Sequence, residues 1–189
     1  MRVIDGDAHF IEPLDVFERY IEPAYRERAL RAATDSTSGA KRLVVDGKPM
    51  AILDVDEFLG AIVAYGQKEA GRNLSNFDRY LAANPEWQDM DKQVRFLDEE
   101  GMACQVIYPS LGLFWEGEVD DPYLADALCR AYNTWTFELC APHKNRLYPA
   151  AHISLRDPHL AVREMERVAK LGCRTIFVAA APIRGRSFG

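Results

Sequence analysis

Apolar and polar positions along the chain follow two different periods, which divide it into strands and helices. Four short apolar runs bounded by turn residues predict strands. They lie at 3–8, 103–108, 147–153 and 174–180. Apolar residues at helical spacing predict helices between these strands. The helical segments run from Pro13 to Pro23 and over about 89–100, 122–140 and 158–171. Strands that alternate with helices indicate βαβ units and a parallel sheet.

The segment 24–88 does not follow this alternation. A polar loop at 34–39 and a short strand at Leu43 to Lys48, entering an Asp-Gly turn, are typical of a hairpin. We interpret 24–88 as an insertion after the first strand. We then expect 1–189, this insertion included, to be the N-terminal part of a single domain.

The number of strands limits the choice of fold. Four strands do not close a (β/α)8 barrel, which typically needs about 250 residues. The chain also stops after its fourth strand, without a helix to cover that strand. A small open α/β sheet and the first half of a barrel both remain open. We expect an α/β fold of the (β/α)8 TIM-barrel type, with about the first four β/α units present.

Composition narrows the class of protein. The 189 residues are 48% hydrophobic, which permits a buried core. Lys and Arg number 23 against 29 Asp and Glu, and the net charge of -6 comes without any basic run, so we expect no nucleic-acid partner. No segment has the roughly 20 apolar residues of a membrane span. The four cysteines form no C-x-x-C pair and are expected to be buried free thiols, so we expect a cytoplasmic protein.

Asp7 and His9 carry the main chemical signal. Residues two apart on a strand project from the same face, so this carboxylate and imidazole can converge on one cation at about 2 Å from each. Glu12 follows closely and is a candidate further ligand or catalytic base. Carboxylate and imidazole ligands suit one divalent ion, and Zn, Mn and Fe(II) all remain open. In the alternative interpretation, Asp7 is a loop or cap residue and His9 is an ordinary polar residue at a strand end.

The stretch VIDGDAHFIEP at 3–13 resembles the opening of the amidohydrolase-related family of metal-dependent TIM barrels. This group includes aminocarboxymuconate-semialdehyde decarboxylase and the resorcylate-type decarboxylases. Later segments follow the same pattern in order, and together they cover nearly the whole chain. They are VIYPSLG at 106–112, YNTW at 132–135, RLYP at 146–149 and LRDP at 155–158.

The resemblance implies a distorted (β/α)8 barrel with a divalent ion at the carboxyl ends of the strands. Its usual first-strand pair is His-x-His, whereas Asp7 stands at the first position here and His9 at the second. An acid at that position also occurs in decarboxylase-like members, so metal binding stays expected while the ion is open. The resemblance also implies a further His from a mid-barrel strand and an Asp from the last strand. Neither lies within these 189 residues.

Three other residues are candidates for the site. His152, at the carboxyl end of the third strand, is a candidate catalytic residue, because barrel enzymes place substrate groups there. The alternative is a hydrogen-bonded core or rim histidine. Trp115, after the second strand, is a candidate substrate-binding residue or simply packs against the insertion. Arg184 is a candidate clamp for a substrate carboxylate, or part of a solvated basic tail.

Three functions follow from these features. The first is a metal-dependent hydrolase that uses metal-activated water on a small organic acid, ester, amide or lactone. The second is a non-oxidative decarboxylase of an aromatic or unsaturated acid. The third is a non-catalytic half-barrel. Because four strands alone expose an edge and an apolar face, we also expect a homo-oligomer.

Overall fold

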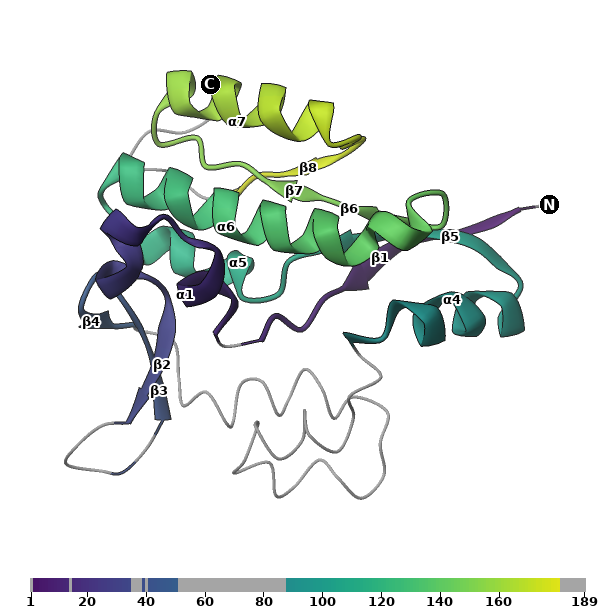
Figure 1. The fold of residues 1–189 in the computed structure, drawn as a ribbon, viewed down its shortest axis with the longest axis horizontal. Helices are drawn as coiled ribbons and strands as arrows, with labels where there is room; N and C mark the ends of the chain where they lie inside the picture. Colours follow the sequence, from purple (N-terminus) through teal and green to yellow (C-terminus); the bar gives the residue numbers. More distant parts are fainter. Residues whose placement is uncertain (1, 14, 35–38, 40, 51–87, 181–189) are drawn as a thin grey trace.

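The computed structural model describes residues 2–13, 15–34, 39, 41–50 and 88–180 (Figure 1). Its strands are β1 (Val3–His9), β2 (Arg31–Thr34), β3 (Lys41–Val45), β4 (Lys48–Pro49), β5 (Met102–Tyr108), β6 (Leu147–Pro149), β7 (Ala151–His152) and β8 (Ile176–Phe177). Its helices are α1 (Val16–Tyr20), α4 (Met90–Glu99), α5 (Gly112–Trp115), α6 (Pro122–Cys140) and α7 (Pro158–Lys170). Short 3-10 turns occur at η1 (Pro23–Arg28), η4 (Glu116–Glu118) and η5 (Ala141–His143). No helix in these ranges is long and apolar enough to cross a membrane.

The main strand layer is parallel and follows chain order. β1 pairs with β5, β5 with β6, and β7 with β8, all in parallel. The N–H of Ala150 donates to the carbonyl of Ile107, so β6 and β7 are two parts of the third strand. Figure 1 shows β8 beneath α7, and α4 contacts β5. The fold is α/β with open sheets and is that of a partial (β/α)8 barrel.

Burial decreases from the centre of this layer to its edges. β6 and β7 are mostly buried, whereas most positions of β1 are exposed and none is fully buried. The nearly continuous apolar run at 103–108 is typical of a strand buried on both faces. In β5, only Gln105 and Ile107 are buried, because its neighbour β1 lies at the edge of the layer and leaves it partly uncovered.

Aspartates and glycines set the helix boundaries. The carboxylates of Asp89, Asp121 and Asp157 accept backbone N–H groups in the first turns of α4, α6 and α7. Gly101 and Gly172 follow α4 and α7 with φ of 67° and 92°, a conformation that glycine adopts without steric cost.

The described part of the segment 24–88 forms a separate antiparallel sheet of β2, β3 and β4. The predicted Asp-Gly turn is confirmed, since Asp46 and Gly47 both have positive φ between β3 and β4. β2 was not predicted, because its four residues show no clear alternation. Arg28 joins the hairpin to α6, with Nε 2.6 Å from Asp46 and Nη1 2.9 Å from Asp121.

Helix α6 holds the core together. Its apolar stripe of Leu124, Leu128, Tyr132 and Trp135 is buried, and the helix contacts α1, α7, β6 and β7. Among the four free cysteines, Cys129 and Cys140 are buried, whereas Cys104 and Cys173 are only half-buried. The expectation of buried thiols is therefore correct for two of them.

Candidate metal-binding and catalytic site

Asp7 and His9 lie together at the carboxyl end of β1. Asp7 Oδ1 is 3.8 Å from His9 Nε2. The Asp5 side chain lies beside them but is already engaged, because it accepts from the Asp7 N–H and from Gln105 on β5. The Asp7 side chain is 92% exposed and that of His9 is 36% exposed, so the pair remains open to further groups.

A backbone contact fixes the orientation of the His9 ring. Nδ1 lies 3.1 Å from the carbonyl oxygen of Pro109, which can only accept a hydrogen bond. Nδ1 therefore carries the hydrogen, and in the neutral ring Nε2 keeps its lone pair. A second hydrogen bond from the other ring nitrogen is the usual arrangement of a metal-ligating histidine.

The pair lies close to the spacing that a divalent ion requires. A tetrahedral ion about 2 Å from each ligand atom separates the two atoms by about 3.3 Å, so the observed 3.8 Å must shorten by about half an ångström to hold one ion. Within the described ranges, no group of three His, Cys, Asp or Glu residues could hold a metal. Asp7 and His9 therefore supply at most a partial ligand set in this part of the chain.

Glu12 lies in the loop after β1 and is completely buried. Its carboxylate accepts the N–H groups of Ser110 and Leu111 at 2.9 and 3.1 Å, which ties this loop to the one after β5. Burial raises the pKa of the Glu12 carboxyl to about 7, although the hydrogen bonds from Leu111 and Ser110 oppose the rise. The side chain can thus hold or release a proton near neutrality. Its predicted role as base or ligand stays a prediction.

His152 and Trp115 form a buried group at the end of the third strand. The Trp115 ring lies 5.0 Å from the His152 ring, and both side chains are fully buried. His152 Nε2 lies 2.9 Å from the carboxylate of Glu116. Burial acts to raise the pKa of Glu116, but His152, Ser154 and Arg156 together outweigh it and hold that pKa below its usual value. Glu116 is thus an ionised acceptor that fixes the histidine ring.

Sequence reasoning assigned no role to Glu116 or Asn133. The Asn133 amide donates to the carbonyl of His152 at 2.9 Å and accepts its N–H at 2.7 Å, as a neighbouring strand would. It also donates to Glu164 on α7 at 2.7 Å. The YNTW motif could have indicated the role of Asn133. An amide among the apolar residues of a buried helix face needs a buried hydrogen-bond partner.

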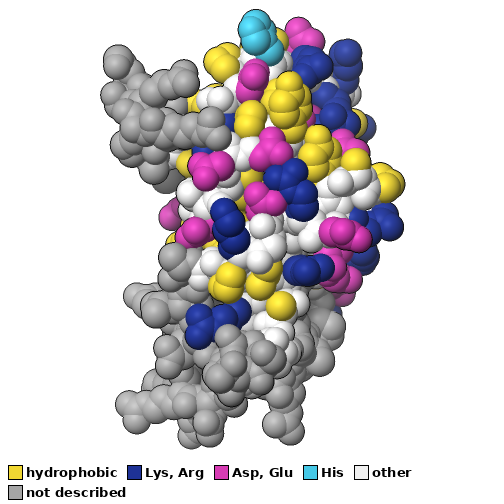
Figure 2. All heavy atoms as spheres, turned by 90° about the vertical axis from the view of Figure 1, so that its left-hand side faces the viewer, with side chains coloured by type: hydrophobic (Ala, Val, Ile, Leu, Met, Phe, Trp, Pro, Cys, Tyr) yellow, Lys and Arg dark blue, Asp and Glu magenta, His cyan; other side chains and the backbone are white. Residues whose placement is uncertain are grey.

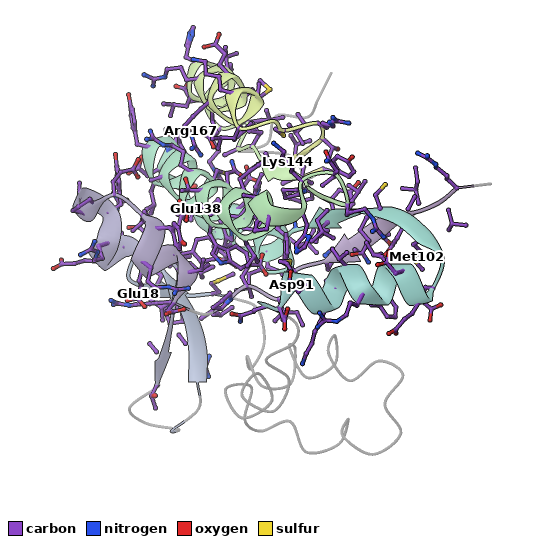
Figure 3. All side chains as sticks on the ribbon, turned by 45° about the vertical axis from the view of Figure 1, so that its right-hand side comes forward. Glu18, Asp91, Met102, Glu138, Lys144 and Arg167 are labelled. Carbon is purple, nitrogen blue, oxygen red and sulfur yellow. The ribbon has the colours of Figure 1, made fainter. Side chains whose placement is uncertain are left out.

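Glu164 continues this network to the surface. Arg167 donates to both of its carboxylate oxygens, and Figure 3 labels Arg167 on α7. A cavity of about 260 Å³ beside them is lined by α6, α7 and the segment around Glu22. Figure 2 shows Lys and Arg side chains intermixed with Asp and Glu on the face that it presents, so no single sign of charge dominates there.

The structure therefore places the five described candidates in three locations. Asp7 and His9 are near each other at the tip of β1, whereas Glu12 is buried beneath the loop after β5. Trp115, the last residue of α5, contacts His152 on β7. Arg184 lies outside the described residues. The roles predicted for all six stay predictions.

Comparison with known proteins gives a clear structural match. No family model matches the chain, and neither does any curated protein. An amidohydrolase from Mycobacterium avium subsp. paratuberculosis K-10 is 26% identical, with a TM-score of 0.74, over 96% of this chain and 50% of that one. A 2,6-dihydroxybenzoate decarboxylase from Rhizobium is 16% identical over 94% and 38%, with a TM-score of 0.47. A dihydroxybenzoic acid decarboxylase from Polaromonas sp. JS666, with bound manganese and 2-nitroresorcinol, is 18% identical over 94% and 38%, with a TM-score of 0.48.

These findings define an α/β protein with the architecture of a partial (β/α)8 barrel. The mycobacterial match confirms the resemblance to the amidohydrolase-related family that the motifs indicate. The chain spans about half the length of that amidohydrolase.

Proposed function

We propose that this chain supplies the first-strand metal ligands of an amidohydrolase-type hydrolase. The observation that supports it is the pairing of Asp7 with His9 at 3.8 Å, with Nδ1 of His9 held by the Pro109 carbonyl. A divalent ion at this position would acidify water or polarise a carbonyl group. Suitable substrates are small esters, amides, lactones or organic acids.

The chain's own residues contribute orientation and proton handling. The loops after β1 and β5 meet through Glu12 and the N–H groups of Ser110 and Leu111, which keeps the Pro109 carbonyl in place beneath His9. His9 is thereby held as the tautomer with a free Nε2. Glu12 can change its protonation near neutral pH, because burial raises its pKa to about 7.

Metal binding provides the direct test. We expect Asp7→Ala and His9→Ala each to weaken Mn²⁺ or Zn²⁺ binding by at least about 100-fold in titration calorimetry, since even outer-shell changes cost 10–100-fold. A second Asp and His pair is the matched control: His143 Nε2 lies 2.6 Å from Asp91 on α4, which Figure 3 labels. Asp91→Ala and His143→Ala should leave binding unchanged. Equal losses in both pairs, or none in either, would refute the proposed metal site.

Non-oxidative decarboxylation is the alternative reaction. The acid at the first ligand position supports it, because the resemblance associates such an acid with decarboxylase-like members. The two reactions differ in their products: hydrolysis adds water across the cleaved ester, amide or lactone bond, whereas decarboxylation releases carbon dioxide. Assays of lactones and esters against carboxylated phenols, with Asp7→Ala as the inactive control, separate them.

A further inference from the structure

The cavity between α6, α7 and the start of η1 has a volume of about 260 Å³. This lies just below the range of about 300–1,000 Å³ that is typical of pockets for drug-sized ligands, so the cavity suits a smaller molecule. All the residues that line it are described, and none of them is one of the candidate metal-binding or catalytic residues. The cavity is therefore separate from the site of the proposed reaction.

Two of the three acidic side chains that line the cavity are already neutralised. Glu22 Oε1 lies 2.9 Å from Nη2 of Arg130 on α6. Glu164 accepts hydrogen bonds from Arg167 at 2.7 and 2.8 Å, one on each carboxylate oxygen. Such charge-assisted hydrogen bonds between a guanidinium group and a carboxylate are strong and geometrically specific. These four side chains therefore offer no net charge to a ligand.

The third acidic side chain, Asp126 on α6, lacks such a partner. It is only 15% exposed, and its carboxylate accepts no hydrogen bond within the described ranges. Its only ion-pair contact there is a long one, 3.9 Å from Oδ2 to Nη1 of Arg130. Burial raises the pKa of this carboxyl to about 6, and the charges of Glu164 and Glu22 add to the rise. An ammonium group of a ligand would supply the missing hydrogen-bond donors.

Arg163 on α7 carries the corresponding unmatched positive charge. It is exposed, and within the described ranges its guanidinium group makes no hydrogen bond and no ion pair. Its charge acts on Asp126 only at longer range, where it opposes the rise in the pKa of that carboxyl. A guanidinium group can bind a carboxylate through two parallel hydrogen bonds. Arg163 is therefore free to bind the carboxylate of a ligand.

The two unmatched charges determine which ligand fits. A simple anion on Arg163 would be repelled by Asp126, and a simple cation on Asp126 would be repelled by Arg163, whereas a zwitterion satisfies both. Tyr25, Tyr123 and Leu160 add aromatic and apolar surface to the wall, which suits an apolar side chain. We propose that this cavity binds a free α-amino acid with an apolar or aromatic side chain, with its ammonium group on Asp126 and its carboxylate on Arg163.

Titration calorimetry with three related ligands tests the proposal on the wild-type protein. L-Phenylalanine carries both charges, 3-phenylpropanoate lacks the ammonium group, and 2-phenylethylamine lacks the carboxylate. We expect L-phenylalanine to bind at least about tenfold more tightly than either analogue, because each analogue leaves one charged group of the cavity unsatisfied. An absence of L-phenylalanine binding, or binding no tighter than that of either analogue, would overturn the proposal.

Substitutions assign the two contacts. Asp126→Asn and Arg163→Ala should each weaken L-phenylalanine binding by about tenfold or more. Asp91→Asn and Arg95→Ala change the same residue types at exposed positions of α4, so they are matched controls and should leave binding unchanged. Full binding in both cavity variants would overturn the proposed contacts. Asp7→Ala should also bind L-phenylalanine normally, so a failed metal site leaves this proposal standing, whereas lost binding in Asp7→Ala would place the ligand at the metal site and overturn it.

Discussion

Glu12→Gln should remove part of the pH dependence of the protein's free energy of unfolding. Burial raises the pKa of Glu12 from 4.5 to about 7. The folded state therefore binds this proton more tightly than the unfolded chain does. Its contribution to the free energy of unfolding is fully present below about pH 4.5 and is lost as the pH rises through 7. A shift of this size corresponds to about 3 kcal/mol.

Glutamine keeps the shape of the protonated side chain and does not titrate. Its carbonyl oxygen can still accept the N–H groups of Ser110 and Leu111, to which Glu12 is bound. Relative to the wild type, we therefore expect Glu12→Gln to gain about 3 kcal/mol in unfolding free energy between pH 5 and pH 8. Asp126, whose pKa burial raises to about 6, titrates in the same window but cancels in the difference between the two proteins.

Urea denaturation at pH 5, 6, 7 and 8, followed by tryptophan fluorescence, measures this difference. Trp115 and Trp135 are both buried and should report the loss of the core. Glu18→Gln on α1, labelled in Figure 3, is the matched control and should follow the wild-type curve. Parallel curves for the wild type and Glu12→Gln would show that the buried carboxyl is ionised throughout, and the reasoning from burial would fail.

Two further substitutions test the packing around His152 by the same denaturation assay. Asn133→Ala should cost about 3 kcal/mol or more, because it leaves the N–H and carbonyl of His152 unpaired, whereas Thr134→Ala should cost less than about 1. Equal costs would contradict a strand-like role for the amide. Gly112→Ala should cost about 1–3 kcal/mol, since its Cβ would lie 2.9 Å from His152 Nδ1; Gly117→Ala, with open space around it, should be neutral. If Gly112→Ala leaves the free energy of unfolding unchanged, the His152 ring moves to make room for the added Cβ.

The helix boundaries and the strand order could be predicted from the sequence because they depend on local signals. Asp89, Asp121 and Asp157 cap their helices through N–H groups two or three residues away. The third and fourth strands were expected to be longer than β6 with β7 and β8. The length of a strand depends on which neighbouring strands pair with it, and local periodicity does not indicate this pairing.

The candidate site was less accessible to sequence reasoning. Asp7 and His9 are two residues apart, so strand geometry alone placed them together. The bond between Glu116 and His152 spans 36 residues and arises only when η4 and β7 are brought to the same end of the layer. The burial of Glu12 beneath the loop after β5 depends on contacts almost 100 residues away. Such long-range burial, and the pKa that follows from it, requires the folded structure.

The Asn133 amide limits where the chain can tolerate a change of length. A residue inserted or deleted within α6 rotates everything beyond it by about 100° around the helix axis. Such a change between the start of the helix and Asn133 leaves two outcomes. Either the Asn133 amide turns away from His152, or the apolar residues that precede it in α6 turn away from the core. The same change in the turn after Cys140 leaves the angular position of Asn133 untouched. Natural length variation should therefore concentrate after the helix and be absent from its first three turns.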